Sequence, residues 1–202
     1  MKFLDLSNKK ILILGPHPDD IELGMGGTLY QIRKYKPKVI VFSDSTNIEG
    51  NNDIVNELEK SMAICGIKYQ CLDYKTMDFV NHITEIRNYV YKLRETDVIF
   101  CTSKNSQHLD HRILGEAVDD IMFGKTILYY EDIRSGQNQH VNCWNEISPT
   151  EFKIKCKMIE QYSSQKHRIY FKQYSFSDLV KFRGAQIEKQ YAEAFELQRF
   201  IL

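Results

Sequence analysis

The sequence has 202 residues, a length that suits one domain and leaves little room for two. Hydrophobic residues make up 43% of the chain and charged residues 27%, a composition that excludes an intrinsically disordered protein. Basic and acidic residues both number 27, so the formal net charge is zero and the basic excess typical of nucleic-acid-binding proteins is missing. No apolar run approaches the ~18–20 residues of a membrane span.

The five cysteines are odd in number and never spaced C-x-x-C, which favours reduced thiols over disulfides or a cysteine-rich zinc site. Residues 1–5 show no signal-peptide pattern ahead of the first apolar run. We therefore expect a cytoplasmic protein with a single domain over residues 1–202, without a nucleic-acid partner.

Short apolar runs at residues 11–14, 39–42, 98–101 and 127–130 predict strands, and residues 69–72 predict a fifth. The four runs are continuous in hydrophobicity and rich in β-branched or aromatic residues, as in parallel strands that helices cover on both faces.

Helical periodicity fills the intervals between these runs. Apolar residues recur at helical spacing over residues 54–62, 83–93 and 113–121, with Gly66 and Gly124 as C-terminal stops. This alternation predicts an α/β, Rossmann-like layered fold with a mostly parallel central sheet flanked by helices.

The last third of the chain has a weaker pattern. Residues 135–150 are rich in Gly, Asn, Gln and Ser and predict a long surface loop, which could select a substrate or simply be solvated. A helix over residues 151–162 and a terminal strand over residues 191–202 complete the expected elements.

A polar turn, Pro16-His-Pro-Asp-Asp20, directly follows the first strand. Ligands of open α/β sheets bind at the carboxyl ends of strands, and Pro18 restrains the backbone of His17. His17 and Asp20 could then donate a nitrogen and an oxygen to one Zn²⁺, which leaves Asp19 free to act on the attacking water. The alternative is a turn without a ligand, because Pro and Asp are good turn formers.

Gly24, Gly26 and Gly27 follow this turn but do not fit the G-x-G-x-x-G spacing. We expect them to let a helix that begins near Gly26 pack closely on the sheet. A phosphate cradle is the alternative.

A second polar segment follows the run at residues 98–101 and contains His108, Asp110 and His111. Catalytic zinc usually has three protein ligands and one open position, so either histidine could complete the set begun by His17 and Asp20. The other histidine, oriented by Asp110, could donate a proton or stabilise an oxyanion. A surface loop is the alternative.

Together, PHPDD at residues 16–20 and HLDH at residues 108–111 resemble the PIG-L/LmbE-like family of zinc-dependent deacetylases that act on N-acetylated sugars and sugar conjugates. The resemblance extends to L-G-M-G-G at residues 23–27, to Y-S-S-Q at residues 162–165 and to Y-A-E-A-F at residues 191–195.

The resemblance implies a role for each matching residue. His17, Asp20 and His111 match the zinc ligands, although two histidines and a carboxylate also suit Fe²⁺. Asp19 matches the general base. The remaining matches are His108 and Asp110, as an acid or electrostatic pair, and Tyr191, near the oxyanion.

Two departures concern substrate binding. The family often has an arginine three residues before the glutamate that Glu59 matches, and Asn56 occupies that position. Arg134 could compensate. The usual G-E-x-G is replaced by the segment at residues 43–47.

The resemblance thus implies a hydrolase that removes an acetyl group from an N-acetylglucosamine-type small molecule. Because relatives often assemble into trimers or hexamers, the resemblance also implies a homo-oligomer. The alternatives are an amidase for a sugar–thiol conjugate or another amide, a non-catalytic metal-binding protein and a nucleotide-binding protein.

Overall fold

The structure, a computed structural model, describes residues 6–201. The prediction that no signal peptide is present concerns residues 1–5, which lie outside the described residues, as does the last residue of the predicted terminal strand.

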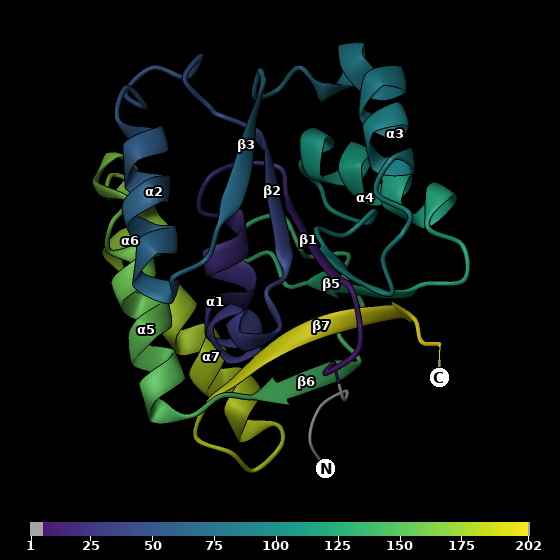
Figure 1. The fold of residues 1–202 in the computed structure, drawn as a ribbon. Coiled ribbons are helices and arrows are strands. Elements are labelled where there is room, and N and C mark those ends of the chain that lie inside the picture. The colour runs from purple at the N-terminus through teal and green to yellow at the C-terminus, as the bar shows by residue number, and fades with distance from the viewer. Residues whose placement is uncertain (1–5, 202) are drawn as a thin grey trace.

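Seven strands form one sheet in the order β3-β2-β1-β4-β5-β7-β6 (Figure 1). The first five strands are parallel, and β7 is antiparallel to both of its neighbours. The strands are β1 (Ile11–Gly15), β2 (Lys38–Ser43), β3 (Tyr69–Tyr74), β4 (Val98–Cys101), β5 (Thr126–Tyr130), β6 (Cys143–Glu146) and β7 (Ala192–Arg199).

Helices cover both faces of this sheet. In Figure 1, α1, α2 and α5 lie on one side of the strands and α3 and α4 on the other. The helices are α1 (Asp20–Ile32), α2 (Ile54–Cys65), α3 (Ile83–Tyr91), α4 (Leu109–Ile121), α5 (Pro149–Ile159), α6 (Ile169–Lys172) and α7 (Ser175–Ala185), with short 3₁₀ turns η1 (Arg33–Tyr35), η2 (Phe79–His82) and η3 (Ser163–Gln165). The α/β, Rossmann-like layered fold is confirmed.

Successive residues of the central strands enter two separate cores. Ile11 and Ile13 pack with α1, α2 and α5, whereas Leu12 and Leu14 pack with α3 and α4. Side chains alternate across a strand, so a strand buried on both faces needs an apolar residue at every position. This explains why these strands appear in the sequence as continuous apolar runs.

The predicted loop over residues 135–150 is wrong in part, because β6 forms within it and α5 begins at Pro149. The polar β6 residue Asn145 is buried, and its amide donates to the side chains of Thr28 and Gln31 at 2.8 Å. Ser148 caps α5 in a capping box with Glu151. The terminal strand is confirmed as β7.

Helix α1 begins at Asp20 instead of near Gly26, and its only break is at Met25, with φ −145°. A Cβ at Gly24 would lie 2.4 Å from the Tyr130 ring, and one at Gly27 would lie 2.7 Å from the Ile147 side chain. The predicted steric role of these glycines is confirmed: they bring α1 close to its neighbours.

The strand order reverses between β1 and β4, so the connections that follow these two strands run in opposite directions and leave a crevice at their carboxyl ends. The two polar segments predicted from the sequence lie at this crevice. None of the helices within residues 6–201 combines the length and apolarity that a membrane crossing needs.

Candidate active site

The side chain of Asp20 stabilises the turn between β1 and α1. Asp20 Oδ2 accepts a hydrogen bond from the backbone N–H of His17 at 3.0 Å. Asp19 lies between them with φ 84°, in the left-handed region that Asp tolerates better than most residues. Strained backbone of this kind is often found at functional sites.

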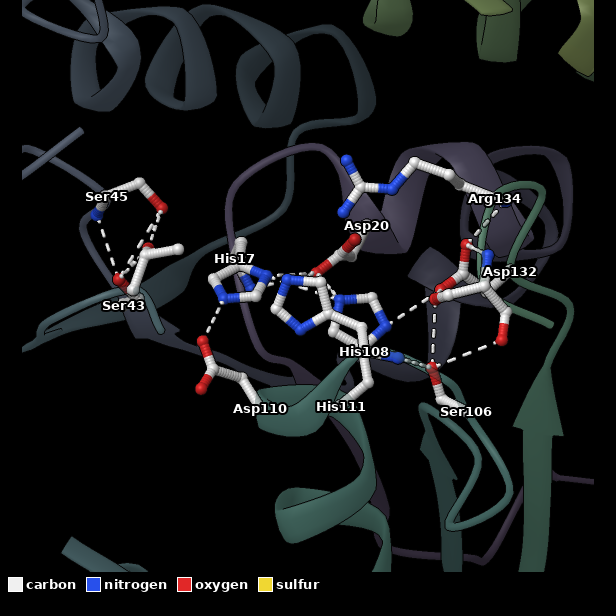
Figure 2. A network of polar contacts seen from close by, with 12 residues as sticks. His17, Asp20, Ser43, Ser45, Ser106, His108, Asp110, His111, Asp132 and Arg134 are labelled. Atoms are coloured by element: carbon white, nitrogen blue, oxygen red, sulfur yellow. Dashed lines mark hydrogen bonds and ion pairs between the residues drawn. The ribbon is translucent and has the colours of Figure 1, made fainter. Parts of the chain in front are cut away.

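Three potential ligand atoms converge at this turn (Figure 2). His17 Nδ1 lies 3.1 Å from Asp20 Oδ2, His111 Nε2 lies 3.2 Å from the same oxygen, and the two nitrogens are 3.3 Å apart. Ligands about 2.0–2.1 Å from a tetrahedral metal are about 3.3–3.4 Å from one another. The three atoms therefore have a spacing that could hold a metal ion.

A carboxylate lies behind each of the two histidines. Asp110 Oδ2 is 2.9 Å from His17 Nε2, and Asp132 Oδ2 is 2.9 Å from His111 Nδ1. Carboxylates in this position fix the ring orientation of metal-binding histidines. The expectation that Asp110 orients His108 is therefore corrected: Asp110 lies in the first turn of α4, where it contacts His17 and accepts from the backbone N–H groups of Met77 and Phe79.

Asp132 was not predicted from the sequence. It follows β5 directly, at the same sheet edge as the two motifs, so the carboxyl-end rule could have found it.

His108 completes a cluster of three histidines whose ligand atoms lie within 4.8 Å of one another. Its ring stacks on that of His111, with 4.5 Å between centroids, and Nδ1 has no hydrogen-bond partner among residues 6–201. Burial and the charges of His111 and His17 lower the pKa of His108 to about 4. The three histidines are an alternative metal-binding set, but the Asp20 set has shorter spacings.

The cluster carries excess negative charge. Burial alone would raise the pKa of Asp20, but His111 and His17 hold it well below its usual value. Burial also opposes ionisation of Asp132, yet His111 lowers its pKa to about 2. Burial would raise the pKa of Asp110, but the contact with His17 lowers it, and the net change is a decrease. Three ionised carboxylates around two imidazoles suit a bound cation.

Asp19 differs from the other carboxylates of the site. It is 8% exposed and lines the cavity, and its carboxylate makes no hydrogen bond within residues 6–201. Burial, followed by the charges of Asp20 and Glu22, raises its pKa well above the usual value. Asp19 is thus the carboxylate in the cavity that is free to exchange a proton.

Polar side chains from several connections form the remaining wall of the cavity. Arg134 follows β5, and in Figure 2 its side chain extends toward Asp20. The other polar residues that line the cavity are Ser45, Asn51, Thr76, Gln165, Arg168 and Tyr170.

Several expected substrate-binding features lie elsewhere. The Tyr191 ring stacks on Phe152 of α5 at 4.2 Å between centroids and does not line the cavity, which contradicts its expected place near the oxyanion. Asn56 is exposed and bonds to Asp53. No residue of the segment 135–150 lines this cavity.

Helix α2 presents Glu57, not Glu59, to the interior. Glu57 is 2% exposed and Glu59 is exposed, because the two positions are about 200° apart around a helix.

The structure is similar to several solved structures of low sequence identity. N,N'-diacetylchitobiose deacetylase from Pyrococcus horikoshii superposes with a TM-score of 0.75 at 23% identity, over 97% of this chain and 87% of that one. A zinc-inhibited form of teicoplanin deacetylase gives 0.72 at 14% identity, over 92% and 96%. The hydratase GalB from Pseudomonas putida KT2440 gives 0.72 at 14%, over 96% and 98%.

The sequence itself matches the profile of the PIG-L family, described as GlcNAc-PI de-N-acetylase, over residues 12–122. This match covers more than half of the chain and contains both polar motifs. The chain therefore belongs to the PIG-L family of de-N-acetylases, a family of amide hydrolases.

Proposed function

We propose that this protein is a metal-dependent deacetylase that removes the acetyl group from an N-acetylated sugar or sugar conjugate of the N-acetylglucosamine type. The observation that carries this proposal is the triangle of His17 Nδ1, Asp20 Oδ2 and His111 Nε2 beside the unbonded carboxylate of Asp19. Family membership and the deacetylases among the similar structures support the same reaction.

We assign the metal site to His17, Asp20 and His111, with Zn²⁺ as the ion and Fe²⁺ as the alternative. A bound Zn²⁺ lowers the pKa of water to about 7 and polarises a carbonyl group. Asp110 and Asp132 keep the two imidazoles oriented through their outer nitrogens.

Asp19 acts as the base. Its carboxylate takes a proton from the water as the water oxygen bonds to the acetyl carbon. His108, adjacent to the ligands, donates a hydrogen bond to the carbonyl oxygen as this oxygen gains negative charge. The carbon–nitrogen bond then breaks, Asp19 returns the proton to the amine nitrogen, and acetate and the amino sugar leave.

The test combines elemental analysis with an assay of acetate release. We expect about one zinc or iron per chain, and acetate release from N-acetylglucosamine compounds that stops after chelation and returns when the metal is restored. Metal without acetate release would contradict deacetylation, and release of another acid would identify a different amide substrate. Failure to bind either metal would contradict the ligand assignment.

A further inference from the structure

Two arginines line the active-site cavity without a carboxylate partner. Neither Arg134 nor Arg168 forms a salt bridge with an acidic residue in the described part of the chain, and no hydrogen bond of the Arg134 guanidinium is present there. By contrast, the partly buried Arg183 pairs with Glu131. Arg134 is exposed, whereas Arg168 is partly buried, and a partly buried arginine usually gains such a partner because its charge is costly to desolvate alone.

Neutral groups hold Arg168 in place. Its Nε donates to Gln165 Oε1 at 2.6 Å, and Gln165 Nε2 donates to Asn51 Oδ1 at 2.7 Å. Gln165 is 2% exposed and Asn51 4% exposed, so this amide chain is part of the interior. The support fixes the guanidinium while Nη1 and Nη2 keep no hydrogen-bond partner within residues 6–201.

Helix α2 anchors the turn that carries this support. Glu57 accepts hydrogen bonds from the backbone N–H of Ser164 at 2.9 Å and from its hydroxyl at 2.6 Å, and it also accepts from the Ser163 hydroxyl. The turn leads directly to Gln165 and then to Arg168. A buried carboxylate therefore stabilises the backbone but does not contact the arginine, which leaves its positive charge available.

Both guanidiniums act on the same part of the cavity. Arg134, Arg168 and Tyr170 all line this cavity, and the positive charges of the two arginines oppose the increase that burial causes in the pKa of the Tyr170 hydroxyl. The two arginines thus line the same cavity as Asp19 and His108.

We propose that Arg168 and Arg134 form an oxyanion-binding subsite, and that the substrate is an acetamido sugar that carries a phosphate or carboxylate group. A fixed guanidinium with free Nη atoms is well suited to such a group, because it offers two parallel N–H donors. This inference rests on the proposed deacetylase function and adds to it the chemical class of the sugar's substituent.

The test measures kcat/KM for acetate release from four compounds. N-acetylglucosamine 1-phosphate, N-acetylglucosamine 6-phosphate and N-acetylmuramic acid carry an anion, and methyl N-acetylglucosaminide is the neutral reference. We expect the protein to prefer at least one anionic compound by about 10-fold or more, as charge-assisted hydrogen bonds allow. Preference for the phosphates or for N-acetylmuramic acid identifies which anion the subsite accepts.

The variant Arg168→Gln should reduce that preference by about 10- to 100-fold. Gln165→Glu should reduce it as well, because it gives Arg168 a carboxylate partner without removing the arginine. The matched control is Arg94→Gln, an exposed arginine stacked over Tyr91, which should leave the preference unchanged.

Equal kcat/KM values for the four compounds, or an equal decrease for all of them in Arg168→Gln, would overturn the subsite and leave the deacetylase function standing. If no compound is hydrolysed, the proposed function fails, and calorimetry with the same compounds decides about the subsite alone. Tighter binding of an anionic compound that is lost in Arg168→Gln would then support it, and equal binding would overturn it.

Discussion

Two buried polar clusters contact α1, and they differ in how completely their groups are paired. In the first, Lys155 Nζ donates to Glu193 at 2.6 Å and to the carbonyl oxygen of Leu23 at 2.7 Å. Glu193 also accepts from the backbone N–H groups of Gly27 at 2.9 Å and Thr28 at 2.6 Å, just after the break at Met25. One cation balances one anion.

The second cluster, at the start of α1, is not balanced in this way. Asp20, Asp110 and Asp132 surround two histidines, and Asp19 has no hydrogen-bond partner for its carboxylate among residues 6–201. Buried charges are normally paired, so three carboxylates that share only two histidines point to a missing cation. The paired cluster stabilises the fold, whereas the unpaired one is suited to chemistry.

The largest expected effect concerns the unpaired cluster. Asp19→Asn should lower kcat by about 10²- to 10⁴-fold, because the amide cannot take up the proton. Asn tolerates the left-handed backbone at this position, so the metal content and the melting temperature should not change. Near-normal turnover in an assay of acetate release would show that Asp19 is not the base.

Substitutions in the paired cluster should change the stability of the fold instead of the catalytic rate. Lys155→Met removes the cation that lies against Glu193 in the interior and should lower the free energy of unfolding by about 3–5 kcal/mol. Urea unfolding measures this effect, and kcat/KM at a temperature where the variant is folded should stay within about 3-fold. The matched control is Lys153→Met, an exposed position on the same helix, with an expected change below about 0.5 kcal/mol. Equal stabilities of the two variants would contradict the comparison.

A smaller effect, on metal affinity, is expected for the carboxylates that contact the metal-binding histidines. Asp132→Asn weakens the contact that orients His111 and should reduce metal affinity by about 10- to 100-fold. Competition with a chelator of known affinity measures this change. Asp73→Asn, an exposed carboxylate on β3, is the control. Unchanged affinity in Asp132→Asn would mean that His111 is not a metal ligand or needs no support.

The smallest effect is expected at Tyr191. Because its ring packs on Phe152 and lies outside the cavity, Tyr191→Phe should change kcat/KM by less than about 2-fold, as for a surface substitution away from the chemistry. A loss of 10-fold or more in the acetate assay would place the Tyr191 hydroxyl in the reaction.

Local sequence patterns determined the central strands of the fold and the location of the candidate site. Continuous apolar runs identified the central strands, since burial on both faces requires an apolar residue at every position. The two polar motifs each directly follow a parallel strand, and the carboxyl-end rule correctly placed His17, Asp20 and His111 in one crevice.

Only the tertiary structure decided which side chains meet. Asp110 contacts His17 instead of His108, and Asp132 contacts His111 from another connection, because the strand order and the phase of α4 set these distances. Likewise, Glu57 is linked to Arg168 only because it binds the turn at Ser164, which lies 107 residues further along the chain. Periodicity acts over a few residues, whereas these pairings depend on where distant segments pack, and that information is not present in any local pattern.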